Sequence, residues 1–163
     1  MAQIEPLINP RDFPKDQVIW DTDAIKAHNP HRFEFRLLDS VLHLDSDSSL
    51  LVAHRHVPED DFWVRGHIPG RPIMPGILML EAMAQAGCIH THMDYHLEEG
   101  RFIGFSAIEN ARFRGSIGPG TDIWIAGKMI RYHESRAYMK WQGQVLIADS
   151  TVICDGTITG MGI

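Results

Sequence analysis

The chain is organised around a long apolar run that directly follows a loop rich in proline and glycine. Residues 66–76 contain three prolines and three glycines, which excludes a regular helix or strand there. From Ile77 to Ile89 the residues are apolar almost all round, and this pattern predicts a buried helix. Pro75 suits its first turn, because the missing N–H would have no intrahelical partner. Such a helix needs cover on most sides, and a curved sheet would supply it.

Two polar residues interrupt the apolar run, and they suggest chemistry. Glu81 and Gln85 are four residues apart, so they share one face of the helix. A carboxyl group on an apolar helix is poorly solvated, so we expect a raised pKa and a general acid at Glu81. His67 lies in the loop as a candidate base, and the N–H groups near Gly76 suit an oxyanion. A solvated histidine and a structurally paired glutamate are the plainer alternatives.

These residues belong to a longer motif. Gly66-His67-x-Pro69-Gly70-x-Pro72-x-Met74-Pro75-Gly76 is followed by Glu81-Ala82-x-Ala84-Gln85. The motif resembles the signature of the beta-hydroxyacyl-acyl-carrier-protein dehydratases of fatty acid synthesis. The similarity runs from about residue 25 to residue 157 and includes Pro30-His31-Arg32-Phe33, Leu38-Asp39, Ala111-Arg112-Phe113-Arg114 and Pro119-Gly120. The chain departs from the family pattern at Ile68 (usually Phe), His56 (Asn) and Thr121 (Asp).

The resemblance implies an α+β hotdog fold, in which a curved antiparallel β-sheet wraps around a long central helix. It implies a hydro-lyase that eliminates water from a (3R)-hydroxyacyl thioester to give the trans-2-enoyl thioester. His67 would be the base and Glu81 of the partner subunit the acid. Gly76 and Ile77 would hold the thioester oxygen, and Gln85 would orient Glu81. No metal or other cofactor is implied.

The resemblance also implies partners and leaves two rival functions. Family members are homodimers, often assembled as hexamers, and they act on an acyl carrier protein that carries a beta-hydroxyacyl group; acyl-CoA is the alternative carrier. An acidic carrier needs a basic patch, for which the candidates are Arg65, Arg71, Arg101, Arg112 and Arg114. A hotdog acyl-thioesterase lacks the loop histidine. A non-catalytic acyl-binding protein gives no reason for both His67 and Glu81.

Length and composition narrow the remaining possibilities. We predict an N-terminal arm over residues 1–19 and a single domain over residues 20–163. The net charge of −6 implies no general affinity for nucleic acid or an anionic membrane. There is no signal-like N-terminus and no run of 18 apolar residues, so we expect no membrane segment and a cytoplasmic location. Two cysteines are too few to form a disulfide framework. Cys88 lies in the apolar run, so we expect it to be a small residue of the core.

The rest of the chain predicts a short helix and an antiparallel sheet. Asp21-Thr22-Asp23 can cap a helix that reaches about His28. Strands are expected within residues 35–44, 50–57, 102–113, 123–130, 137–147 and 151–154, joined by short polar turns. After Ile89 the helix becomes polar, which predicts a solvent-exposed C-terminal end and termination of the helix at Gly100. Two histidine pairs, His54 with His56 and His92 with His96, suit solvated faces better than metal, because a third ligand is not evident.

Overall fold

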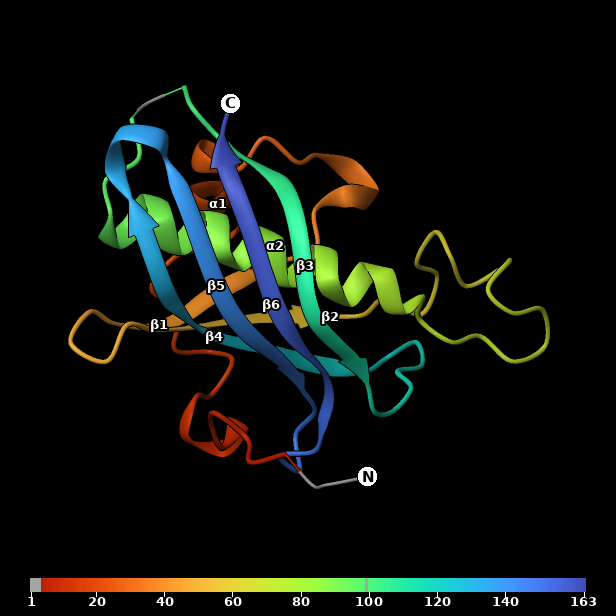
Figure 1. The fold of residues 1–163 in the computed structure, drawn as a ribbon. Coiled ribbons are helices and arrows are strands. Elements are labelled where there is room, and N and C mark those ends of the chain that lie inside the picture. The colour runs from red at the N-terminus through yellow and green to blue at the C-terminus, as the bar shows by residue number, and fades with distance from the viewer. Residues whose placement is uncertain (1–3, 99) are drawn as a thin grey trace.

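The structure, a computed structural model, describes residues 4–98 and 100–163. One long helix lies against a single six-stranded sheet that curves across it (Figure 1). All strand pairs are antiparallel, in the order β1-β2-β4-β5-β6-β3. The predicted α+β architecture, with a curved antiparallel sheet around a long central helix, is confirmed.

The elements follow the chain in a simple order. The strands are β1 (Ser40–Asp45), β2 (Leu50–His56), β3 (Ile103–Phe113), β4 (Asp122–His133), β5 (Tyr138–Leu146) and β6 (Val152–Gly162). The helices are α1 (Thr22–His28) and α2 (Gly76–Asp94), and the 3₁₀ turns are η1 (Pro10–Asp12), η2 (Phe33–Phe35) and η3 (Glu134–Arg136). Asp21 caps α1 as predicted, because its side chain accepts hydrogen bonds from the backbone N–H groups of Asp23 and Ala24.

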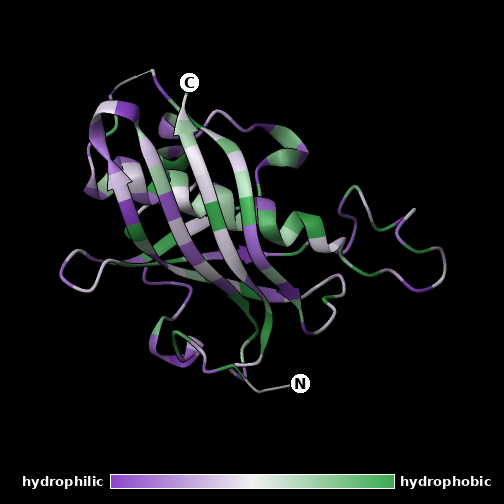
Figure 2. Ribbon diagram, viewed as in Figure 1, coloured by the Kyte–Doolittle hydropathy of each residue, from purple (hydrophilic) through white to green (hydrophobic). Residues whose placement is uncertain are grey.

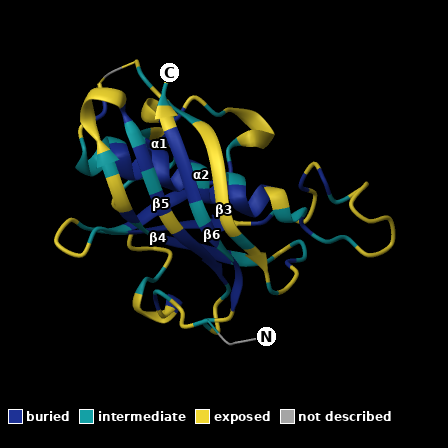
Figure 3. Cartoon of the chain, in the orientation of Figure 1, coloured by how far each residue is buried: buried dark blue, intermediate teal, exposed yellow. Residues whose placement is uncertain are grey.

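Helix α2 is buried because its sequence offers no continuous polar face to water. Met79, Met83 and Ala86 are each at most 2% exposed and belong to one core cluster with Trp141 and Ile125 of the sheet. Burial of each large apolar side chain contributes about 1.5–3 kcal/mol. Much of the helix behind the strands is dark blue in Figure 3, and Figure 2 shows apolar residues, in green, on both the helix and the strands. This packing fixes the backbone that carries the two polar residues of the helix.

The two ends of α2 differ from the prediction. The helix ends at Asp94, so Gly100 is not its stop. His90, expected at a wet end, is fully buried, and its Nδ1 accepts a hydrogen bond of 3.0 Å from the indole N–H of Trp141. At the other end, Ile77 was predicted to be buried, but it is 60% exposed. His90 can be buried because it bonds to Trp141 of the distant strand β5. The sequence pattern around His90 does not reveal that partner.

Three further details correct the predicted sheet. His54 does not lie on a solvated face: it is buried on β2, and its Nε2 lies 3.0 Å from an oxygen of Asp122. The first strand begins only at Ser40, because residues 33–35 form η2. The last strand continues past residue 154 to Gly162.

The described part of the N-terminal arm, residues 4–19, packs on the sheet. Ile8 is buried in a second apolar cluster with Trp124 and Leu146. The Gln144 side chain accepts from the N–H of Leu7 at 2.8 Å. The Trp124 indole donates to the carbonyl of Phe13 at 3.0 Å. The arm therefore covers the face of the sheet opposite α2; the division into arm and domain stays a prediction.

Strand β3 is the exposed edge of the sheet. Eight of its eleven residues are exposed, and within the described residues it pairs only with β6. Phe105, Ile108 and Phe113 are 45%, 36% and 50% exposed, and the strand is largely yellow in Figure 3. An edge strand with exposed apolar side chains is a template for pairing with another chain.

Candidate active site

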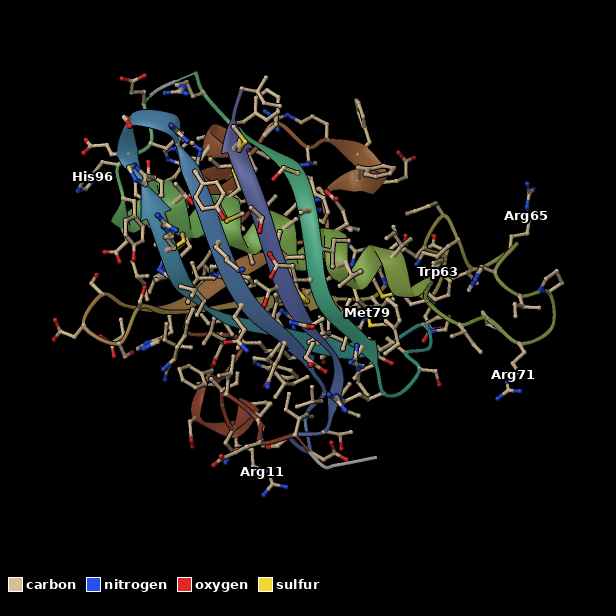
Figure 4. All side chains as sticks on the ribbon, in the orientation of Figure 1. Arg11, Trp63, Arg65, Arg71, Met79 and His96 are labelled. Atoms are coloured by element: carbon tan, nitrogen blue, oxygen red, sulfur yellow. The ribbon has the colours of Figure 1, made fainter. Side chains whose placement is uncertain are left out.

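The loop that carries His67 projects from the molecule beyond the N-terminal end of α2. Figure 1 shows it as a long excursion, and Figure 4 shows Arg65 and Arg71 pointing outward from it. Its base is anchored by Trp63, which is 4% exposed and whose carbonyl accepts from the N–H of His67 at 2.8 Å. The N–H of Ile73 donates to the carbonyl of His67 at 2.8 Å. The histidine backbone is thus held from both sides while its side chain stays exposed.

One hydrogen bond defines the tautomer of His67. Its Nδ1 lies 2.6 Å from the carbonyl oxygen of Ile73. A carbonyl can only accept, so Nδ1 carries a proton. In the neutral ring, Nε2 then has a free lone pair and can take a proton from a ligand. The side chain is exposed, as the plainer alternative of a solvated histidine expects, but its Nδ1 is bonded to the backbone of Ile73.

Glu81 lies in a polar network on the face of α2. Its Oε1 accepts a hydrogen bond of 2.9 Å from the amide of Gln85, one turn along the helix. The same amide donates to the carbonyl of Phe35 at 2.8 Å, and Gln85 Oε1 accepts from the N–H of Leu37 at 3.0 Å. Gln85 is 2% exposed, so a buried and fully bonded side chain orients the carboxylate.

A residue that the sequence reasoning did not single out completes this network. His31 Nε2 lies 3.3 Å from Glu81 Oε1. His31 is part of the Pro30-His31-Arg32-Phe33 segment, where a resemblance to the family was noted without a role. That segment was the signal that could have identified it.

The predicted raised pKa of Glu81 is wrong for this chain. Its pKa lies below the ordinary value, chiefly because of the interaction with His31 and in addition because of the Gln85 amide. Burial acts in the opposite direction but is outweighed. An apolar helix therefore does not leave this carboxyl group without solvation, since neighbouring side chains replace the water.

An apolar cavity leads away from the carboxylate. Its volume is about 130 Å³. His31, Glu81 and Gln85 lie on its wall with Cys88, and the other lining residues are Ala84, Phe102, Ile103, Gly104, Phe105, Met139 and Ile158. Most of these side chains are hydrocarbon, and they come from α2, β3, β5 and β6. The arrangement suits a short apolar chain whose polar end lies near Glu81.

The N-terminal end of α2 is shaped for close approach to a ligand. Pro75 is the N-cap, and Gly76 and Ile77 form the first turn. The N–H groups at these two positions have no intrahelical acceptor, and the helix dipole is positive there. A Cβ at Gly76 would come within 2.9 Å of two ring atoms of Phe113, so only glycine fits beside that ring. Ile77 is 60% exposed, so this end of the helix borders solvent; the oxyanion role of Gly76 and Ile77 stays a prediction.

Within one chain, His67 and Glu81 are not brought together. No hydrogen bond or ion pair joins them among residues 4–98 and 100–163; the contacts of His67 are with Trp63 and Ile73, and those of Glu81 with His31 and Gln85. His67 lies on the projecting loop, and Glu81 lies five residues, about 7.5 Å, into the helix.

Other predicted features are distributed differently. Arg114 is bonded to Asp155 at 2.5 Å, which neutralises one candidate of the basic patch. His92 lies beside His28, with ring centroids 5.1 Å apart and ring planes tilted by 42°. In the described part of the chain no group of three or more histidine, cysteine or acidic side chains is placed to hold a metal ion. No described helix is long and apolar enough to cross a bilayer.

Comparison with known proteins decides the family. The model of the FabA-like domain matches residues 29–157. The chain belongs to the FabA-like family. One relative is the protein named 3-hydroxyacyl-[acyl-carrier-protein] dehydratase FabZ from Coxiella burnetii (strain RSA 331 / Henzerling II). The two sequences are 35% identical over 127 residues, which cover 77% of this chain and 87% of the relative. The resemblance to the dehydratases is confirmed.

Solved structures agree on the fold. The dehydratase heterocomplex ApeI:P from Xenorhabdus doucetiae superposes with a TM-score of 0.67 at 16% identity, covering 85% of the FabA-like chain and 90% of its own. A mutant of the thioesterase PA1618 from Pseudomonas aeruginosa gives a TM-score of 0.63 at 14% identity, covering 89% and 95%. At such identities the likeness concerns the fold alone.

Proposed function

We propose that this FabA-like chain is a 3-hydroxyacyl-[acyl carrier protein] dehydratase, a hydro-lyase that converts a (3R)-hydroxyacyl thioester into the trans-2-enoyl thioester. The observation that carries the proposal is the presence of two separate catalytic groups in one chain. One is a loop imidazole with a free Nε2; the other is an oriented carboxylate at the mouth of an apolar cavity. Relatives named for this activity share the family and most of the chain.

The chemistry follows from the atoms available. His67 Nε2 removes the proton alpha to the thioester, as a general base. The N–H groups of Gly76 and Ile77 hold the thioester oxygen as it gains negative charge, assisted by the helix dipole. The Glu81 carboxyl group delivers a proton to the beta-hydroxyl, which leaves as water. Gln85 keeps that carboxyl group in position, and a thioester acidifies its own alpha carbon without a cofactor.

The site is assembled from two subunits in this proposal. His67 makes no contact with Glu81 of its own chain within the described residues, so in this proposal the Glu81 that it works with belongs to a second copy. The exposed edge of β3, with Phe105, Ile108 and Phe113, is a self-complementary surface on which two copies can pair antiparallel. A homodimer is therefore the functional unit, and a trimer of such dimers is its higher assembly.

A groove beside the active-site cavity offers a place for the carrier. It has a volume of about 600 Å³, and its lining includes Lys26, Arg32 and Arg101 but no aspartate or glutamate among the described residues. Outside the lining, Lys26 and Arg101 pair with the exposed Asp23 and Glu98 at 3.2 and 3.4 Å, and such exposed pairs are weak. Phe102 lines both this groove and the cavity of Glu81. A phosphate or an acidic carrier surface would be attracted there. We assign the carrier to this groove. We also propose a cytoplasmic location, because a reducing compartment suits two buried cysteines that form no disulfide.

One observation favours a second candidate, an acyl-thioesterase. A carboxylate with a lowered pKa can activate water as a base, and this reaction would leave His67 unused. Hydrolysis releases a free thiol, whereas dehydration leaves the thioester intact and creates a conjugated double bond.

The test is a spectrophotometric assay with a short 3-hydroxyacyl thioester. We expect enoyl thioester to form without release of thiol. His67→Ala and Glu81→Gln should each lower the rate by roughly 10²–10⁴-fold while the fold persists. His133→Gln, an exposed histidine at the end of β4, is the matched control and should keep full activity. Thiol release, or normal turnover by either site variant, would overturn the proposal.

For the carrier groove, Lys26→Ala and Arg101→Ala should raise the KM for carrier-bound substrate. The KM for a truncated thioester that lacks phosphate should not change, because that substrate does not reach the groove. Equal effects on both substrates would show that the groove does not bind the carrier.

A further inference from the structure

His31 is held in place by the segment that surrounds it. It lies between α1 and η2, where the guanidinium of Arg32 donates to the carbonyls of Asn29 and His31, both at 2.8 Å. The Asn29 side chain in turn donates to the carbonyl of Gln85 at 3.1 Å. The segment is therefore tied to α2 next to Glu81, and the 3.3 Å contact between His31 Nε2 and Glu81 Oε1 belongs to an organised site.

The geometry raises a difficulty for the mechanism. An acid must carry the proton that it delivers, yet the pKa of Glu81 is lowered. At neutral pH the carboxyl group of Glu81 is therefore ionised in the free chain. A nearby group has to provide the proton that the leaving hydroxyl receives.

We propose that His31 is the proton store of this site and passes its proton to the leaving hydroxyl through the Glu81 carboxyl group. The inference rests on the proposed function and deepens it. His31 does not touch the substrate in this proposal. It acts through Glu81 as a positioning residue, and it also supplies the proton that Glu81 passes on.

The other groups that face the carboxylate cannot take this role. The titratable side chains in the cavity lining are His31, Glu81 and Cys88, contributed by the α1–η2 segment and α2; the lining residues from β3, β5 and β6 do not titrate. Burial raises the pKa of the Cys88 thiol to about 11, so it gives up no proton at neutral pH. Gln85 donates hydrogen bonds but does not titrate. Only an imidazole exchanges a proton near pH 7.

The second nitrogen of His31 is consistent with a mobile proton. Nδ1 is buried and has no hydrogen-bond partner among the described residues. In the imidazolium this nitrogen would carry a buried N–H without an acceptor, which is unfavourable, so the charged ring depends on the nearby Glu81 carboxylate. Once that carboxylate receives a proton, the support for the charged ring is lost. His67 differs, because its Nδ1 proton is fixed by the carbonyl of Ile73.

The protons balance over one turnover. The imidazolium of His31 first transfers its Nε2 proton to the ionised Glu81 carboxylate. The carboxyl group formed in this way then transfers a proton to the beta-hydroxyl oxygen as the C–O bond breaks and water leaves. The electron pair of the alpha C–H bond forms the new double bond, and its proton goes to His67 of the partner subunit. The site is left with His31 neutral, Glu81 ionised and His67 protonated. Solvent returns the proton from His67 to His31.

The experiment is the pH profile of kcat/KM for wild type and His31→Gln. Glutamine can still donate a hydrogen bond to Glu81 but cannot store a proton. A carboxyl group ordinarily loses its proton at lower pH than an imidazole does, so the alkaline limb should move to lower pH. The rate near pH 7.5 should then fall roughly 100-fold, the lower end of what a general acid contributes, and the deficit should shrink as the pH is lowered. His133→Gln is the matched control and should keep the wild-type profile.

Two outcomes would overturn the proposal. A wild-type profile in His31→Gln would show that His31 only positions Glu81, and a uniform loss at every pH with an unmoved limb would show a structural role. A second readout does not need activity: carboxyl NMR should show that the pKa of Glu81 rises in His31→Gln, and an unchanged pKa overturns the coupling. If wild type itself forms no enoyl thioester, the proposed function fails, while the NMR titration still tests the pair.

Discussion

The Gln85→Leu substitution probes the network that holds the site together. Gln85 is 2% exposed and makes three side-chain hydrogen bonds, with Phe35, Leu37 and Glu81, at 2.8–3.0 Å. Leucine has a similar volume, so the substitution removes these bonds without opening a large cavity. The segment between α1 and β1 would lose two of its bonds to α2, while the bond from Asn29 to the backbone carbonyl of residue 85 would remain.

The cost can be worked from the exposure of each partner. Leu37 is fully buried, so its N–H would be left without an acceptor, at about 1–3 kcal/mol. The Phe35 residue is half exposed and the Glu81 carboxylate partly so, and water can replace much of what they lose. The sum is about 2–4 kcal/mol, which lowers the Tm by roughly 5–15 °C for a chain of this size.

Thermal and urea unfolding of the purified protein measure this cost. Thr91→Val is the matched control on the same helix, since Thr91 makes one side-chain hydrogen bond, 2.9 Å to the carbonyl of Gly87. It should cost about 0.5–1.5 kcal/mol. A Gln85→Leu protein whose Tm falls no further than that of the control would refute the account of the network.

Two further predictions concern the interior. Burial lowers the pKa of His90 to about 4 from 6.5; the unfolded chain therefore binds the extra proton first, and stability should fall as the pH drops from 6.5 to 4, by up to about 3 kcal/mol. His90→Gln should lose less over this window in urea titrations, and an equal loss would exclude His90 as the cause. Ala84→Leu should fill part of the cavity beside Glu81 and lower kcat/KM more for long acyl chains than for short ones; a uniform change would show that the acyl chain lies elsewhere.

Local patterns predicted much of this architecture. The apolar run after Pro75 was enough to expect a buried helix, and the alternation of short apolar segments with polar turns was enough to expect an antiparallel sheet. These are properties of neighbouring residues, so a sequence contains them. The cap at Asp21 and the start of the helix directly after Pro75 are also properties of neighbouring residues.

The errors came from contacts between distant residues. His90 was expected to be solvated, but it is buried, and the indole of Trp141, 51 residues away, donates a hydrogen bond to its Nδ1. The pKa of Glu81 was expected to rise, but His31, 50 residues earlier in the chain, lowers it. His54 was expected on a solvated face, and Asp122 pairs with it there. In each case the pattern of apolar and polar residues along the chain does not show which distant polar side chain the fold brings into contact.

The most direct test of the shared site is complementation between two inactive variants. Protomers with His67→Ala and protomers with Glu81→Gln are unfolded together and refolded to mix the subunits. In a mixed dimer one site receives both intact residues, so random pairing should restore about a quarter of wild-type activity. If the mixture stays as inactive as each variant alone, while mixed dimers are shown to form, then His67 and Glu81 do not meet across subunits and the central claim is contradicted.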